Sequence, residues 1–530
     1  MNPPARRRLA VTMSMFSNLT AVGLLLAAGA TNALAQTFRS DDPVIRRMWE
    51  VGMKNSQTET LAQVLMDSFG PRLAGSPELA AAQDWLVGVY ESWGVPVWKE
   101  EYGTWVGWRQ GYLHVDLVSP RTQTLEAEIL SLSPGSHGPV EGDVVVPPQG
   151  LSDETVSEWL ETVRGKFVLM VAPEPMCRAP QELVANARPE TVARIDSLRR
   201  AWQVEFAERV RPLGGNRGPL LIEGAGAAGI IVSRWSQGWG VNKIGSTVTA
   251  MIPSFDLSCE DYGMLFRMAE RGQGPRIRVD ASAEYLGEVV QFNLIAELRG
   301  TELPDEFVVL SAHLDSEHGA TGATDNGTGT ITMLEAMRIL KETYPNPRRT
   351  ILVGHWGAEE SGLIGSRAFT EDHPEVLEGL QALFNQDNGT WRIEKIEGQG
   401  LLHAGDHIMR WMSFVPTDIS EHITLEFPGA QENTGSDHVA FLCHGVPAFR
   451  LQSSYGEYRQ YTWHTNRDTY DKIVFDDLKE NATLAAMLAY AASEDPERVP
   501  RDRSVLPIDP RTGQPREWVQ CRPARRSVNQ

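Results

Sequence analysis

The sequence has few basic residues relative to its acidic ones. Its 49 Lys and Arg are outnumbered by 69 Asp and Glu, so the formal net charge at pH 7 is −20. Nucleic-acid-binding proteins need basic surfaces that neutralise phosphates, and this balance therefore argues against a nucleic-acid partner. The charged fraction, 22%, is ordinary for a soluble globular protein, and 530 residues exceed what one domain usually holds.

Cysteine is scarce as well. The four cysteines are Cys177, Cys259, Cys443 and Cys521, and their spacing fits no zinc-binding motif. Cys177 and Cys259 could form a disulfide in an oxidising compartment, but the sequence alone does not decide this. Cys443 follows the apolar run Val439–Leu442, so we interpret it as a small buried hydrophobic residue.

Long apolar runs are missing beyond residue 35, so no later segment is expected to cross a membrane. The first 35 residues combine Arg6–Arg8, the apolar stretch Leu19–Ala30 and an A-x-A site at Ala33–Ala35. This pattern predicts a signal peptide that is removed before Gln36, with an N-terminal anchor helix as the alternative. We expect an exported protein, periplasmic or secreted, that uses either the general or the twin-arginine route.

Several common catalytic motifs are absent. The sequence contains no HExxH, no GxSxG and no Walker lysine motif, which excludes the usual single-zinc protease, serine-hydrolase and P-loop classes. Gly224–Gly229 matches GxGxxG, but a dinucleotide site needs a strand before this motif and a helix after it. Because the β-branched run Ile230–Val232 follows, we interpret Gly224–Gly229 as a helix end that turns into a strand.

Strand and helix patterns alternate from residue 292 onward. Buried strands are predicted over Phe307–Leu310, Thr350–Val353 and Leu380–Phe384, and a helix over Ile331–Leu340. Such alternation is typical of an α/β fold with a mostly parallel central sheet and helices on both faces.

The chain before residue 292 suggests an insertion. Short β runs over about 120–285 predict a small β-rich inserted domain, in which the charged helical stretch 182–210 is a lid or a solvated face. We therefore expect a signal peptide (1–35), a discontinuous main domain (36–119 and 286–500), the inserted domain (120–285) and a tail (501–530). The tail is rich in Pro and Arg, so it is expected to be poorly ordered or to lie over a surface.

Potential metal ligands follow the predicted strands. In open α/β sheets, ligands bind at the carboxyl ends of the strands, where residues remote in sequence can meet. The five candidate metal ligands are His313, Asp325, Glu360, Asp387 and His464. They divide into two sets that share Asp325: one metal would take Asp325, Glu360 and His464, and the second would take His313, Asp325 and Asp387.

The chemistry of these ligands favours a pair of divalent cations. Cocatalytic metals lie about 3.5–4 Å apart and share a bridging carboxylate. A mixed set of imidazole and carboxylate ligands suits two Zn²⁺ ions, with Co²⁺ or Mn²⁺ as possible substitutes. A water that bridges such a pair is a hydroxide near neutral pH, which suits the hydrolysis of an amide.

Three further residues are candidates for catalytic roles. Glu359, beside a ligand, is the predicted general base and acid that carries a proton from the water to the leaving amine. Asp315 is predicted to accept the second N–H of His313 and to fix its tautomer. His438, in Ser436–Asp437–His438, either polarises the scissile carbonyl or is structural. Four other histidines are interpreted as ordinary solvated residues: His355, His373, His403 and His422.

These segments resemble the dizinc aminopeptidase and glutamate carboxypeptidase superfamily. The resemblance rests on His313–Asp315, Asp325–Gly329, Glu359–Ser366, Asp387 and His464–Thr465. Together with Gly70–Ser76 and the insertion, they look most like the carboxypeptidase Q branch, over residues 40–500. The resemblance implies a phosphorylase/hydrolase-like fold with a protease-associated insertion. It also implies exohydrolysis of dipeptides or short peptides, often by homodimers.

Two alternatives share this scaffold. Glutaminyl cyclases use a single zinc for an acyl transfer, and some receptors on the scaffold have lost their ligands and bind partners instead. No ligand is missing here, which favours the two-metal hydrolase. The free peptide end that is recognised stays open: a free amine needs a nearby carboxylate, and a free carboxylate needs an arginine, for which Arg450, Arg459 and Arg467 are candidates.

Overall fold

The computed structural model describes residues 41–247 and 249–528, so the predicted signal peptide lies outside the described residues. The described chain begins with α1 (Pro43–Trp49), α2 (Thr58–Gln63) and α3 (Pro77–Ser92). The side chain of Ser76 accepts the N–H of Leu79 at 3.1 Å and caps α3, which starts with a proline. Among the described residues, no helix combines the length and apolarity that a membrane span requires.

Four parallel strands form the centre of the main sheet. They run in the order β14 (Ala448–Ser453), β11 (Leu380–Asn385), β9 (Leu303–His313) and β10 (Arg349–Trp356). Antiparallel strands flank them: β8 (Arg276–Leu298) pairs with β10, and β12 (Ile393–Glu397) pairs with β14. β13 (Thr424–Glu426) pairs parallel with β12 at the edge. The predicted α/β fold with a mostly parallel central sheet is confirmed.

Helices cover both faces of this sheet. Phe307 and Val309 of β9 pack in one hydrophobic cluster with Phe369, Val376 and Phe441. Those three side chains belong to α10 (Ile364–Asp372), α11 (Pro374–Gly379) and α14 (His438–Leu442). On the other side, α9 (Thr328–Thr343) and α15 (Phe475–Glu494) contact each other and β9. Two further helices lie in the chain between β12 and β13: α12 (Ala404–Met412) and α13 (Thr417–Ser420).

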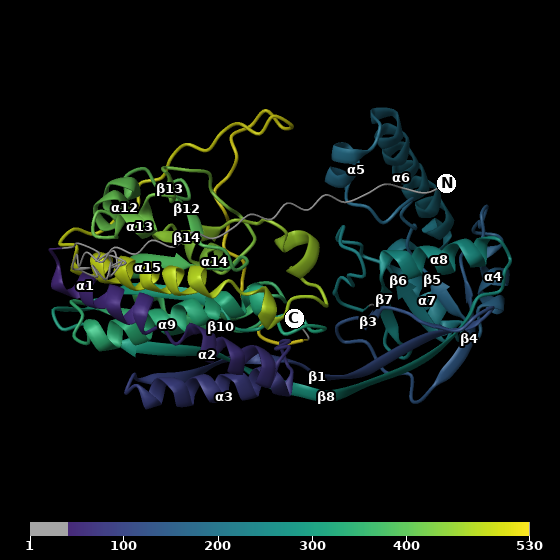
Figure 1. Cartoon of the computed structure of the whole chain (residues 1–530), viewed down its shortest axis with the longest axis horizontal. Coiled ribbons are helices and arrows are strands. Elements are labelled where there is room, and N and C mark those ends of the chain that lie inside the picture. Colours follow the sequence, from purple (N-terminus) through teal and green to yellow (C-terminus); the bar gives the residue numbers. More distant parts are fainter. Residues whose placement is uncertain (1–40, 248, 529–530) are drawn as a thin grey trace, which may run out of the picture. The chain divides into compact units, whose positions relative to one another are not determined.

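A long antiparallel ribbon leads to the insertion. β1 (Val97–Ser119) pairs with β8 along almost its whole length, and Figure 1 shows the ribbon running from the main sheet to a second group of strands. This group contains β2 (Gln123–Thr124), β3 (Ala127–Ile129), β4 (Val140–Val145), β5 (Phe167–Leu169), β6 (Gly229–Val232) and β7 (Ser254–Leu257).

The insertion is more helical than the sequence suggested. Its strands β4 to β7 are mutually parallel, and parallel neighbours need long crossover connections. Helices supply two of them: α4 (Val156–Thr162) joins β4 to β5, and α5 (Pro180–Asn186), α6 (Pro189–Val210) and α7 (Gly218–Gly224) lie between β5 and β6. A further helix, α8 (Cys259–Glu270), follows β7. The charged stretch forms α5 and α6. Gly224 ends α7 shortly before β6, as the interpretation of the GxGxxG match predicted.

The described residues contain two disulfide bonds. Cys177 bonds to Cys259, the pairing that the sequence left open. The interpretation of Cys443 as a buried hydrophobic residue was wrong, because Cys443 is only half-buried and bonds to Cys521 in the tail. The tail therefore lies against the main domain, the second of the two arrangements that the sequence allowed.

One of the four supposedly solvated histidines is a core residue. His355 is the penultimate residue of β10, is fully buried, and shares a 2.8 Å hydrogen bond between its Nε2 and the hydroxyl of Tyr90. Burial lowers the pKa of His355 to about 3, so the imidazole stays neutral. A neutral ring with a hydrogen-bond partner is readily buried in a sheet, and local sequence does not separate this case from an exposed histidine.

Candidate metal centre

The five predicted ligands meet at the carboxyl edge of the parallel strands. His313 is the last residue of β9, and Asp387 follows the end of β11 by two residues. Glu360 lies in the loop after β10, and Asp325 lies in the segment that leads into α9. His464 comes from the loop between β14 and α15, where it holds a positive φ of 54°. The strand-end placement read from the sequence is what brings these side chains together.

Asp325 stands between the two histidines. Its Oδ1 lies 3.6 Å from Nε2 of His313, and its Oδ2 lies 3.2 Å from Nε2 of His464. Nε2 of His313 is also 3.3 Å from Oδ1 of Asp387, and Nε2 of His464 is 2.9 Å from Oε2 of Glu360. Asp325 therefore contacts the histidine of each predicted ligand set, and Glu360 and His464 also lie close to Glu317.

The side chains at this centre fit divalent cations. Oδ2 of Asp325 and Oε1 of Glu360 are buried and accept no hydrogen bond within the described residues. Burial and then the nearby Asp325 raise the pKa of Glu360 to about 8. Burial alone would lower the pKa of His464, but Glu360 and Asp325 raise it to about 11. Buried carboxylates of this density are costly without positive charge between them, and a pair of zinc ions would supply it.

Asp315 has a different role from the predicted one. Nδ1 of His313 lies 2.9 Å from the backbone carbonyl of Asp315, whereas the carboxylate is 3.7 Å away. The carboxylate instead accepts the backbone N–H groups of Glu359 (3.0 Å) and Glu360 (3.2 Å). The prediction that the carboxylate of Asp315 fixes the tautomer of His313 was therefore wrong. The backbone carbonyl of Asp315 orients the ring, and its carboxylate holds the loop after β10.

Glu359 lines the cavity beside the ligands, and no hydrogen bond or ion pair involves its carboxylate among the described residues. Burial, opposed by His313, raises the pKa of Glu359 well above its usual range. This position suits the proton carrier that the sequence predicted.

His438 is the predicted residue that the structure does not bring to the cavity. It is fully buried at the start of α14, and its Nε2 lies 2.8 Å from Oε2 of Glu432. The other oxygen of Glu432 accepts from Arg450 at 2.9 Å. Burial would raise the pKa of Glu432, but His438 and Arg450 lower it to about 2. His438 is not among the residues that line the cavity.

Sequence reasoning missed three residues that support the centre. Asp468 accepts the backbone N–H groups of Thr324 (2.7 Å) and Asp325 (3.0 Å). Glu317 lies close enough to Glu360 and His464 to form a third group of potential ligands. Arg72 is fully buried, and four backbone carbonyls accept its N–H groups: those of Leu314, Gly70, Thr321 and Gly322.

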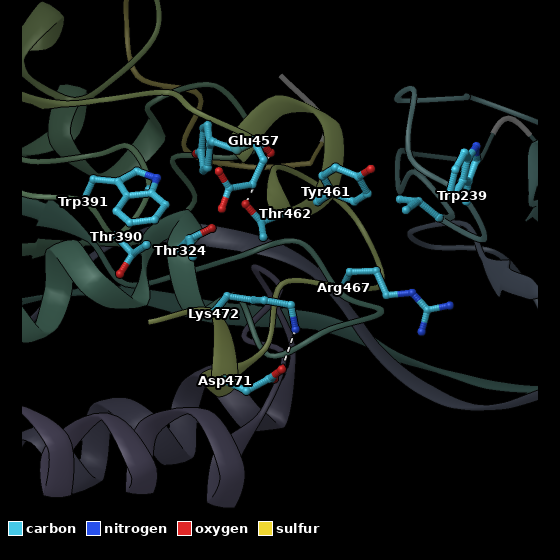
Figure 2. Close-up of a pocket in the computed structure, with 13 residues that line it drawn as sticks. Trp239, Thr324, Thr390, Trp391, Glu457, Tyr461, Thr462, Arg467, Asp471 and Lys472 are labelled. Atoms are coloured by element: carbon cyan, nitrogen blue, oxygen red, sulfur yellow. Dashed lines mark hydrogen bonds and ion pairs between the residues drawn. The ribbon is translucent and has the colours of Figure 1, made fainter. Parts of the chain in front are cut away.

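The centre opens into a cavity of about 430 Å³. The residues that line it come from several loops, β14, α10 and the tail: Asp325, Glu359, Glu360, Gly362, Leu363, Arg367, Asp387, Asn388, Thr434, Gly435, Arg450, Tyr455, Tyr458, Arg459, Trp463, His464 and Arg522. A second cavity, about 410 Å³ in volume, shares Tyr458 with it. Figure 2 shows Trp391 on one side of this second cavity and Tyr461 and Trp239 on the other.

Residues 293–489 match the model described as "Peptidase family M28". The chain contains a peptidase family M28 domain. This domain holds all five predicted ligands and Glu359, whereas the insertion, β1 and the tail lie outside the match. The resemblance stated from the sequence motifs is confirmed at this level.

Individual relatives extend the likeness beyond the M28 domain. Carboxypeptidase Q of Rattus norvegicus is 26% identical over 83% of this chain and 85% of its own length. Human carboxypeptidase Q is 25% identical over 84% of this chain and 87% of its own. Both alignments cover much more of the chain than the M28 domain alone.

Solved structures share the fold. A peptidase M28 precursor from Shewanella amazonensis is similar with a TM-score of 0.63 at 24% identity, over 86% of this chain and 97% of that one. A zinc aminopeptidase from Bacillus subtilis is similar with a TM-score of 0.53 at 18% identity, over 84% and 97% of the two chains.

Proposed function

We propose that this chain is a zinc-dependent exopeptidase that hydrolyses dipeptides or short peptides. One observation carries the proposal: Asp325 turns one carboxylate oxygen to His313 and the other to His464, so that two ligand sets share it. The likeness to carboxypeptidase Q and to a zinc aminopeptidase supports a peptidase and zinc.

The ligands and Glu359 would divide the chemistry. Asp325, Glu360 and His464 would hold one zinc, and His313, Asp325 and Asp387 the second. Zinc at such a site polarises the scissile carbonyl and makes a water nucleophilic at neutral pH. Glu359 would take the proton of the attacking water and deliver it to the leaving amine, because its carboxylate faces the cavity without a partner among the described residues. The carboxylate of Asp315 would hold Glu359 in place by accepting the backbone N–H of Glu359.

A single-zinc acyltransferase of the glutaminyl-cyclase kind is the alternative with the same scaffold. It needs only one ligand set. Here each of the two sets has an imidazole, a carboxylate that the other set does not use, and the shared Asp325. A non-catalytic binding protein would have no use for the buried Oε1 of Glu360, which accepts no hydrogen bond among the described residues and is costly unless it binds a cation.

The proposal also covers location and assembly. Two disulfides support an exported protein in an oxidising compartment, periplasmic or extracellular. We propose that the insertion between β1 and β8 is a protease-associated-like domain. The protein as a whole would act on peptides, bind neither nucleic acid nor a membrane, and assemble as a homodimer.

A substrate panel tests the proposal. Free dipeptides, N-acetylated dipeptides and dipeptide amides are incubated with the zinc-loaded protein, and a chelator control is run for each. The proposal expects hydrolysis of at least the free dipeptides, its loss with the chelator, and its return with added zinc. Turnover that survives chelation, or no turnover of any peptide, would remove the exopeptidase. Intact turnover of N-acetyl peptides would exclude an aminopeptidase and leave a carboxypeptidase.

A further inference from the structure

Four arginines line the cavity of the metal centre, and two of them already have partners. Arg450 is buried and pairs with Glu432 at 2.9 Å. Arg459 lies between the ring faces of Tyr455 and Trp463, each about 4.9 Å from its guanidinium carbon. These two side chains are therefore committed to the wall of the cavity.

The side chains of Arg367 and Arg522 have no such partners among the described residues. Within residues 41–247 and 249–528, no carboxylate lies within 4 Å of either guanidinium, and neither donates a hydrogen bond from its side chain. Burial lowers the pKa of Arg367, and the charge of Arg522 lowers it further. Two guanidinium groups that line one cavity attract an anion, because both carry a positive charge.

Arg522 is exposed, yet its backbone is tied down on both sides. Cys521, the preceding residue, bonds to Cys443 at the end of α14. The backbone N–H of Val519 donates to Oε1 of Gln431 at 3.1 Å, and that of Ala524 donates to Oε1 of Glu371 at 2.8 Å. The tail thus presents Arg522 at the rim of the cavity at a fixed place.

The next residues of the tail are held as firmly. Arg526 forms 2.9 Å hydrogen bonds with the carboxylate of Asp372 in α10, and its carbonyl accepts the N–H of Thr104 at 2.9 Å. That carbonyl runs so close to Gly103 that a Cβ there would lie 2.2 Å from it, and Gly103 has a φ of +149°. Only glycine fits this approach, which marks the docked tail as part of the folded domain.

We propose that Arg367 and Arg522 form a subsite for the carboxylate of a peptide substrate, and that the disulfide-anchored tail exists to complete it. The inference rests on the proposed function and adds its specificity: the free α-carboxylate at the C-terminus is recognised. Guanidinium groups bind carboxylates through paired, charge-assisted hydrogen bonds, and a pre-positioned group loses less entropy on binding. Arg367 lies inside the region that matches the M28 family and Arg522 lies outside it, so the tail supplies only one of the two guanidinium groups.

Kinetics with matched substrates test the subsite. Arg522→Gln and Arg367→Gln are compared with wild type on a hydrolysable dipeptide and on its C-terminal amide. We expect KM for the free acid to rise roughly 10- to 100-fold with kcat changed less than about 3-fold. The reason is that the lost contact stabilises the bound substrate and the transition state equally. The amide should be hydrolysed equally by all three proteins. Arg516→Gln, an exposed arginine of the same tail, should match wild type on both substrates.

A dipeptide amide with an acidic side chain separates the two sources of a carboxylate. If Arg522→Gln raises KM for the acidic amide as much as KM for the free acid, the subsite binds side-chain carboxylates, and the assignment to the C-terminus is wrong. An equal loss on acid and neutral amide, or no change in KM, overturns the subsite altogether.

Binding provides a readout that does not depend on turnover. The dipeptide and its amide are titrated calorimetrically into zinc-loaded Glu359→Gln, alone and combined with Arg522→Gln. Weaker binding of the acid alone supports the subsite even if wild type hydrolyses nothing, in which case the proposed function fails by itself. A Cys443→Ser/Cys521→Ser protein that remains folded should share the KM defect for the free acid; wild-type KM in that protein would contradict the role of the anchor.

Discussion

The carboxylate of Asp468 accepts the backbone N–H of Asp325 with an O–N distance of 3.0 Å. Its second oxygen accepts the N–H of Thr324 at 2.7 Å, so one buried side chain fixes the segment that carries the proposed shared ligand. Asp468 lies four residues after His464 and thereby links the loops of two ligands. Partners of this kind control metal affinity because they orient the ligands.

Replacing Asp468 should weaken metal binding. Asp468→Ala removes both acceptors, and we expect zinc affinity to fall roughly 10- to 100-fold. Competition with a zinc-binding dye measures the change. Asp471→Ala provides the control, since Asp471 is exposed and, within the described part of the chain, pairs only with Lys472 and Thr469. Equal zinc affinities for the two variants would mean that Asp468 does not support the centre.

Glu359→Gln should separate catalysis from metal binding. The amide keeps the size of the side chain but does not carry a proton, so we expect kcat to fall by roughly 10²- to 10⁴-fold with normal zinc content. Glu360→Gln is the matched comparison, because it changes a ligand and should lower zinc content as well. Unchanged turnover in Glu359→Gln would remove Glu359 from its role.

Arg72→Lys should destabilise the fold although the charge is retained. The guanidinium donates to four carbonyls around the centre, and an ammonium on a flexible stem does not reach all of them. Each buried carbonyl left without a donor costs about 1–3 kcal/mol, so we expect the free energy of unfolding in urea to fall by about 2–4 kcal/mol. Arg109→Lys, an exposed pair with Glu284, should change it by less than about 1 kcal/mol. Similar values for the two variants would contradict the clamping role of Arg72.

His373 should make the stability of the domain depend on alkaline pH. Hydrogen bonding to Glu100 (3.0 Å), opposed by burial and aided by Glu375, raises the pKa of His373 to about 9. A raised histidine pKa stabilises the fold fully below about pH 6.5 and loses this contribution as the pH rises through about 9.

His373→Gln therefore should cost about 1–2 kcal/mol of unfolding free energy at pH 6 and much less at pH 10, after allowance for the partial exposure of the pair. Urea unfolding at the two pH values measures the difference, with His403→Gln as an exposed control. A cost that does not change with pH would show that the ring acts by packing and not by its charge.

Much of the site could be predicted because its signals are local. His313, Glu360 and Asp387 follow apolar runs that form β9, β10 and β11, and a parallel sheet brings the ends of such strands to one edge. Asp325 and His464 joined the set through the type and number of ligands that a metal pair needs. The alternation of strands and helices in the main domain was predictable for the same reason.

The remaining features depend on tertiary contacts. A lone Asp468 or Arg72 in a loop looks like any solvated charge, and only the fold shows which backbone groups it meets. The bond between Cys443 and Cys521 spans 78 residues, and the apolar run before Cys443 pointed to burial. The spacing of residues does not show that His438 pairs with Glu432. It also does not show which group of Asp315, the carbonyl or the carboxylate, contacts His313.

The shared carboxylate of Asp325 is the centre of the account, and anomalous diffraction from zinc-soaked crystals tests it most directly. The account predicts two zinc peaks about 3.5–4 Å apart, one on each side of that carboxylate, with Asp387 and His313 on one ion and Glu360 and His464 on the other. A single peak, or zinc bound away from Asp325, would contradict it.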